Sequence, residues 1–159
     1  MTARDIARTA VIAAVYVAIT QMVSPFAFHA VQVRVSEALT VLPYLTVHAV
    51  PGLTIGVFIA NTIGPLGIVD MIFGSLATLI SALLTRKMPS PYLAPLPPII
   101  INAVIVGGYL NVILGIEDGP VLFTMLAVGV GQLISCYVLG LPLLLGIKRT
   151  PVLRRIFSS

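Results

Sequence analysis

The chain of 159 residues is 58% hydrophobic and 9% charged, with a mean hydropathy of +1.11, whereas soluble domains carry about 25% charged residues. A water-facing surface cannot be built from so few charges, which excludes a soluble protein and predicts an all-α membrane protein with a single transmembrane domain over residues 1–159. The net charge of +4 does not indicate nucleic-acid binding, because the basic residues flank apolar runs and form no stripe.

Six apolar runs, separated by turn or charged residues, predict six membrane-spanning helices. The first follows two arginines and resembles a signal peptide, but no small-residue cleavage site follows it, so we expect it to be retained. Ser36 is a suitable N-cap for the second run, and Pro51–Gly52 predicts a turn beside the third. Five prolines in 88–98 exclude regular helix throughout that connection. The expected spans are 6–23, 36–48, 50–63, 69–84, 98–114 and 121–147.

The distribution of charge decides between six spans and five. The second and third runs have only about 13 residues each against the roughly 20 that a crossing needs, so they could form one span. Six spans place eight of the nine basic residues in the cytoplasm and leave only Arg34 outside. Five spans would move Arg86, Lys87 and the basic tail outward. The positive-inside rule therefore favours six spans with both termini in the cytoplasm.

This topology gathers the rare polar residues at the outer ends of the spans and in the outer loops. Ionisable side chains at membrane depth are costly and usually face a cavity on a substrate path. Their convergence from different segments predicts a polar pocket that is open to the outside. The candidate substrate-binding residues are Gln32, Arg34, Glu37, Asn61, Asp70, Tyr109, Asn111 and Glu117.

Structural alternatives exist for these residues. Arg34 and Glu37 are three positions apart and can form an ion pair at the start of a helix. Asp70 can interact with a helix dipole, and Asn61 can cap a helix end. Glu117 lies in a Gly/Pro turn where it can simply be solvated, and an aromatic residue such as Tyr109 is often a packing residue or an interface anchor.

Ala10, Ala14 and Ala18 recur at helical spacing in the first expected span. They form a smooth face on which another helix can pack closely. That helix can belong to this chain or to another protein, and the spacing alone does not distinguish the two.

Motifs for catalysis and for metal binding are absent from the sequence. No G-x-x-x-x-G-K-[ST] loop occurs, so the chain cannot itself be an ATPase. There is no H-E-x-x-H or G-x-S-x-G motif, and two histidines and one cysteine give no metal-ligand cluster. We therefore expect no enzyme, no metal and no cofactor.

The segment Arg34-Val-Ser-Glu-Ala-Leu-Thr-Val-Leu-Pro43 resembles the QueT family, the queuosine-precursor substrate-binding (S) components of energy-coupling factor (ECF) transporters, and the likeness continues through 49–53, 60–61 and 70–78. The resemblance implies six helices, an outer pocket and a prokaryotic plasma membrane. It implies a complex with a transmembrane coupling (T) subunit and two ATPase subunits, in which the S component topples to carry its ligand inward. The Ala10, Ala14 and Ala18 face is similar to the one by which S components contact the coupling subunit.

Queuosine precursors are 7-deazaguanines, and the outer polar residues offer partners for them. Two adjacent N–H donors on a guanine-like edge suit a carboxylate such as that of Glu37, and the ring carbonyl suits an amide or Arg34. A cationic aminomethyl substituent suits a second acid. A flavin, a pteridine or a thiamine-like ligand would also find partners here, so another vitamin-like ligand and a stand-alone carrier stay open as alternatives.

Overall fold

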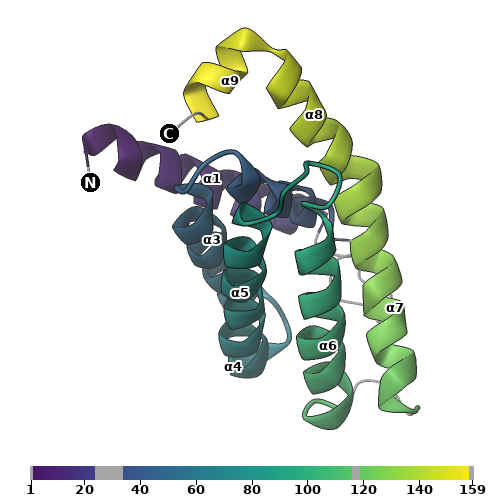
Figure 1. Cartoon of the computed structure of the whole chain (residues 1–159). Helices are drawn as coiled ribbons and strands as arrows, with labels where there is room; N and C mark the ends of the chain where they lie inside the picture. Colours follow the sequence, from purple (N-terminus) through teal and green to yellow (C-terminus); the bar gives the residue numbers. More distant parts are fainter. Residues whose placement is uncertain (1, 24–33, 116–118, 158–159) are drawn as a thin grey trace.

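The computed structural model describes residues 2–23, 34–115 and 119–157, and every regular element among them is helical. The longer helices form a bundle (Figure 1). The elements are α1 (Ala3–Met22), the 3-10 helix η1 (Val35–Tyr44), α3 (Ala49–Ile63), α4 (Gly67–Val69), the π-helical segment η2 (Asp70–Gly74), α5 (Ser75–Arg86), α6 (Leu96–Val112), α7 (Val121–Leu133), the π-helical segment η3 (Ile134–Gly140), α8 (Leu141–Arg149) and α9 (Pro151–Phe157).

Successive helices run in alternating directions between two ends of the bundle. In Figure 1, α3 and α6 run downward, whereas α4–α5 and α7–α8 run upward. The end that contains the start of α1 and the ends of α5 and α8 carries Arg4, Arg8, Arg86, Lys87, Lys148 and Arg149, and we call it the basic end. A 3.3 Å contact between the Asp5 Oδ1 and the His48 Nε2 and a cation–π contact of 5.3 Å between Lys148 and the Tyr44 ring join helix ends there.

The surface and the interior have the polarity expected of a membrane protein. Three continuous helices, Ala3–Met22, Gly67–Arg86 and Val121–Arg149, are long and apolar enough to cross a membrane, and Ala49–Ile63 and Leu96–Val112 are shorter apolar helices. Large apolar side chains of α7, including Leu122, Phe123 and Leu126, are exposed. Among the described residues, 17 polar or charged side chains are buried beside 22 hydrophobic ones, so polar groups make up a large share of the interior under an apolar surface.

Glycines allow two helix pairs to approach closely. A Cβ at Gly52 of α3 would lie 2.9 Å from the carbonyl oxygen of Thr9 in α1, and a Cβ at Gly56 would lie 3.0 Å from the Tyr16 Cβ. A Cβ at Gly107 of α6 would lie 2.6 Å from the Cα of Met125 in α7. Small residues at such contacts are typical of membrane helices, because they allow backbones to pack closely where the hydrophobic effect gives no drive.

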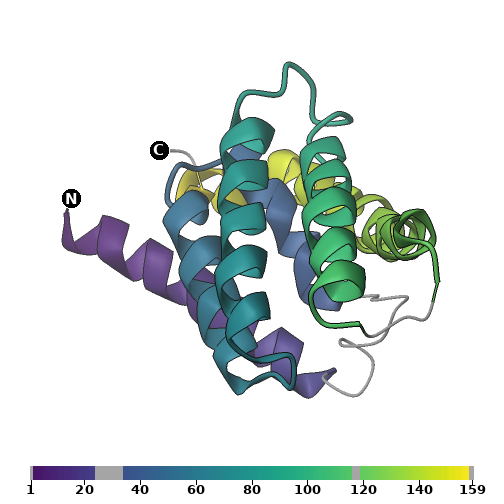
Figure 2. The ribbon, with the colours of Figure 1, turned by 90° about the horizontal axis from the view of Figure 1, so that it is seen from below.

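The second expected span differs from the prediction. The segment starts close to the predicted position, but its N-cap is Arg34 and the prediction of Ser36 as the N-cap is wrong: Ser36 lies inside the helix, where its Oγ accepts a hydrogen bond from Thr20. The segment forms a 3-10 helix that ends at Tyr44, and eight of its ten residues are buried. Figure 2 shows η1 (blue) in the middle of the bundle, where it contacts α1, α3, α5, η3 and α8. Ten residues at about 2.0 Å per residue reach only about 20 Å, less than the roughly 30 Å hydrocarbon core. The count of six full crossings and the cytoplasmic location of both termini therefore stay predictions.

Two local features of η1 accompany its 3-10 conformation. Pro43 has no N–H and cannot donate the α-helical bond to the residue four positions earlier. The Thr40 hydroxyl donates a 2.6 Å hydrogen bond to the carbonyl oxygen of Glu37, three positions earlier.

The predicted turn at Pro51–Gly52 is wrong. These two residues lie in the first turn of α3, where proline is tolerated because the N–H groups of a first turn have no intrahelical acceptor. The chain turns instead between η1 and α3, at residues 45–48. The helix α9 was not expected; Pro151 is its first residue, a position that proline favours.

Candidate functional site

A buried polar cluster lies at the end of the bundle opposite the basic end. We call Arg34, Asn61, Asp70 and Tyr109 the Arg34 cluster. The Arg34 Nη2 donates a 2.7 Å hydrogen bond to the Asn61 Oδ1 and lies 3.6 Å from the Asp70 Oδ2. The Asn61 Nδ2 donates to the Asp70 carbonyl oxygen at 2.9 Å, and the Tyr109 hydroxyl donates to the Asp70 Oδ1. The cluster therefore joins η1, α3, η2 and α6 at one point.

Local backbone structure brings these side chains together. Asp70 begins the π-helical segment η2, and single π turns inside helices are frequent at functional sites. Gly74, at the end of the same segment, faces the cluster: a Cβ there would lie 2.7 Å from the Asn61 Nδ2 and 3.1 Å from the Asp70 Oδ1. Only glycine leaves room for Asn61 to reach both Arg34 and Asp70.

A second polar group lies one helical turn deeper in the bundle and is centred on Glu37. The Glu37 side chain is only 2% exposed. Its Oε1 accepts a 2.5 Å hydrogen bond from the Tyr16 hydroxyl, and its Oε2 accepts a 3.3 Å bond from the Asn102 Nδ2. We call Glu37, Tyr16 and Asn102 the Glu37 cluster. It ties α1, η1 and α6 together.

The two clusters place three ionisable groups of unequal charge inside the bundle. Arg34 interacts electrostatically with the carboxylates of both Asp70 and Glu37. With all three ionised, the clusters carry one positive and two negative charges. Burying such charges is costly unless each is paired and hydrogen-bonded. The Asp70 Oδ2 is buried and accepts no hydrogen bond from the part of the chain that the structure describes. The Asp70 carboxylate therefore has an acceptor oxygen that is not used by a hydrogen bond within the described residues.

The structure brings together four of the eight predicted substrate-binding residues, and Glu37 lies directly beneath them. Asn61 does not act only as a helix cap, because its amide bridges Arg34 and Asp70. Asn111 lies elsewhere: its Nδ2 donates to the Gly119 carbonyl oxygen and to the Thr124 Oγ1, which joins the end of α6 to the start of α7.

Gln32 and Glu117 lie outside the described residues, so their predicted roles stay predictions. Sequence reasoning did not include Tyr16 or Asn102 among the site residues, although both contact Glu37. One signal could have indicated that Tyr16 faces the interior. It lies four positions from Ile12 and four from Thr20, on one face of α1, and all three residues are buried.

The small-residue stripe of α1 is on the outer surface of the described chain. Ala10, Ala14 and Ala18 are exposed, whereas the face of α1 that packs inside the protein carries Ile12 and Tyr16. The stripe forms one wall of an apolar groove of about 480 Å³, and Ile55 and Ile59 of α3 belong to the other wall. Internal packing is therefore not the role of these alanines, and their predicted role in docking stays a prediction.

No cluster of three or more potential metal ligands occurs among residues 2–23, 34–115 and 119–157.

Comparison with known proteins identifies a family. The model of the family described as QueT transporter matches residues 6–149 of the chain. No curated protein and no solved structure matches the sequence.

Proposed function

Because the chain belongs to the QueT transporter family, which is a family of transporters and not of enzymes, we propose that it is the S component of an ECF transporter. In this role it captures a queuosine precursor, a 7-deazaguanine, at the outer end of the bundle. The observation that carries the proposal is the Arg34 cluster, in which a buried Asp70 oxygen accepts no hydrogen bond from the described chain.

The chemistry of the Arg34 cluster matches a guanine-like ring. Two adjacent N–H donors on the edge of that ring suit a carboxylate, and Asp70 has an available oxygen for one of them. The ring carbonyl suits the N–H groups of Arg34 or Asn61. Tyr109 offers an aromatic wall beside these groups, and its ring lies 6.0 Å from that of Phe73. Glu37 is a further acceptor, since a carboxylate can accept more hydrogen bonds than the two that it accepts here.

The charge of the two clusters favours a precursor with an aminomethyl group. We infer that both carboxylates are ionised when the ligand is bound; one arginine then leaves a net negative charge, which an ammonium group on the ligand would neutralise. A neutral 7-deazaguanine, such as one with a nitrile in place of the amine, would leave that charge unbalanced inside the bundle. The amine is therefore the proposed source of selectivity among queuosine precursors.

The exposed alanine stripe supports the coupling role. Ala10, Ala14 and Ala18 present a groove to the surroundings, and a helix of a coupling subunit can pack closely against such small residues. The sequence has no ATPase motif, so energy for uptake comes from the two ATPase subunits of the complex. A prokaryotic plasma membrane is the location proposed for this assembly.

Calorimetric titration of the purified protein tests the ligand. We expect aminomethyl-7-deazaguanine to bind at least about tenfold more tightly than its nitrile analogue, because a charge-assisted hydrogen bond contributes about 1.5–3 kcal/mol. Asp70→Asn should remove most of this difference, whereas Asn111→Ala, outside both clusters, should preserve it. Equal affinity for the amine and the nitrile contradicts the charge argument. Tight binding of a flavin or a thiamine-like ligand instead favours a different S component, and uptake by the purified chain alone in liposomes favours a stand-alone carrier.

A further inference from the structure

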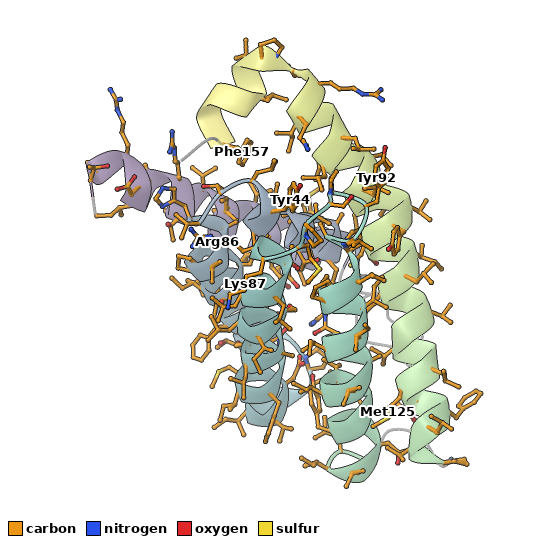
Figure 3. All side chains as sticks on the ribbon, in the orientation of Figure 1. Tyr44, Arg86, Lys87, Tyr92, Met125 and Phe157 are labelled. Atoms are coloured by element: carbon orange, nitrogen blue, oxygen red, sulfur yellow. The ribbon has the colours of Figure 1, made fainter. Side chains whose placement is uncertain are left out.

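A second, smaller cleft lies at the basic end, between the first half of α1 and the end of α9. Its volume is about 220 Å³. The helix α9 folds back toward the bundle, and Figure 3 shows Phe157 at its end on the side that faces the bundle. Phe157 packs against the core around Ile12. The cleft is lined by Ala7, Arg8, Val11, Ile12, Thr46 and Phe157.

One wall of this cleft contains a hydroxyl group without a partner in the described part of the chain. Thr46 is 2% exposed, and its buried Oγ1 forms no hydrogen bond with residues 2–23, 34–115 or 119–157. A buried hydroxyl is costly unless it is hydrogen-bonded, and nearly all buried polar groups have a partner. Thr46 lines the cleft, and a rotation of its side chain would present the hydroxyl to an acceptor on a ligand bound there.

The charge around the cleft is positive. Arg8 lines it and Arg4 lies one helical turn earlier in α1; Lys148 and Arg149, which do not line the cleft, add positive charge at the same end of the bundle. Of the described acidic residues, only Asp5 is at this end, and it already caps α1 and pairs with the imidazole at the start of α3. Basic pockets between membrane helices on the cytoplasmic side bind anionic lipid head groups. The cleft thus combines a cationic rim, apolar walls and one hydroxyl donor.

We propose that this cleft is a binding site for one anionic phospholipid, such as phosphatidylglycerol. The lipid phosphate contacts Arg8, part of one acyl chain lies against Val11, Ile12 and Phe157, and an ester carbonyl accepts a hydrogen bond from the Thr46 hydroxyl. The lipid thereby bridges α1 and α9. The site is distinct from the Arg34 cluster and does not depend on which solute the protein transports.

Native mass spectrometry of the purified full chain tests the site. The protein is incubated with phosphatidylglycerol or with phosphatidylcholine of the same acyl chains, and the retained lipid is counted. We expect a preference for phosphatidylglycerol that Arg8→Gln lowers about fivefold, which corresponds to about 1 kcal/mol for one basic residue near an anionic lipid surface. Arg86→Gln is the matched control, because it removes the same charge at the same end but does not line the cleft. It should retain the preference.

Two further variants test the hydroxyl and the volume of the cleft. Thr46→Val keeps the shape of the side chain but removes the donor, and it should lower phosphatidylglycerol retention severalfold. Val11→Trp fills the cleft without changing the charge, and the 60% exposure of Val11 gives a larger side chain room to fit without unfolding the protein. It should displace the lipid.

Three results would overturn the proposal. One is equal retention of the two lipids by the unmodified protein. Another is an equal loss in Arg8→Gln and Arg86→Gln, which would mean diffuse attraction to the membrane surface. The third is a cross-link in membranes from Val11→Cys to a helix of another protein, which would make the cleft a protein-docking surface.

Discussion

Replacing Glu37 by Gln tests how the buried polar network holds the bundle together. The Glu37 carboxylate accepts hydrogen bonds of 2.5 Å from Tyr16 and 3.3 Å from Asn102, and it is almost fully buried. In the Glu37→Gln variant, one acceptor oxygen becomes an NH2 group that faces a donor. Hydrogen bonds to charged groups contribute about 1.5–3 kcal/mol, whereas bonds between membrane helices average about 0.6 kcal/mol with a maximum near 1.7. We therefore expect the ligand-free variant to lose about 2 kcal/mol of unfolding free energy.

A double-mutant cycle isolates the contribution of the shorter bond. Unfolding of Glu37→Gln, Tyr16→Phe and the double variant is measured in detergent micelles, with Tyr137→Phe as the control, because the Tyr137 hydroxyl makes only an exposed bond to the Tyr92 carbonyl oxygen. We expect a coupling energy of about 1 kcal/mol or more between Glu37 and Tyr16. The reasoning is refuted if the two single changes are additive, or if Tyr16→Phe is no more destabilising than Tyr137→Phe.

The exposed alanine stripe and the alternating helix directions give two further predictions. Ala14→Trp should abolish uptake in cells that contain the coupling module. It should leave ligand affinity unchanged in calorimetry, because Ala14 faces away from the bundle interior. A parallel loss of ligand binding would show that the stripe has a structural role. Ser90 lies between α5 and α6 and Gly119 lies between α6 and α7, so the two positions are at opposite ends of α6. Cysteines at these positions should react with a membrane-impermeant maleimide from opposite sides of the membrane. Labelling of both from the same side would contradict the predicted topology.

The apolar helices could be located from the sequence because composition and turn residues alone determine them. The expected ranges 6–23, 50–63 and 98–114 correspond to Ala3–Met22, Ala49–Ile63 and Leu96–Val112. The expected fourth and sixth spans are continuous helices that contain the π-helical segments η2 and η3. A hydropathy pattern does not distinguish a π turn from an α turn, since only one hydrogen-bond register changes.

The second span could not be predicted correctly because tertiary contacts decide its structure. Its apolar residues have the composition of a membrane helix, but η1 is short and buried on all sides by other elements. The Thr40 side-chain bond and Pro43 lie within this 3-10 segment. Neither feature is decisive when the sequence is considered alone, because threonine and proline also occur within ordinary membrane helices.

The candidate site was partly predictable for a different reason. Arg34, Asn61 and Asp70 are rare polar residues at the same ends of successive helices, so alternating helix directions bring them together. Their pairing was not predictable: Arg34 contacts Asp70, 36 positions away, whereas Glu37, only three positions away, is held by Tyr16 and Asn102. The predicted role of Glu37 in binding a guanine-like edge stays a prediction, and its hydrogen bonds to Tyr16 and Asn102 add an expected loss of stability in Glu37→Gln.

Native mass spectrometry for a small molecule that co-purifies with the chain tests the central claim most directly. The protein is purified from its native host or from a host that makes queuosine precursors, then released from detergent in the gas phase. We predict an adduct with the mass of a 7-deazaguanine on the unmodified protein and its loss in Asp70→Asn. An adduct with the mass of a flavin or a thiamine, or equal occupancy in Asp70→Asn, would contradict the account.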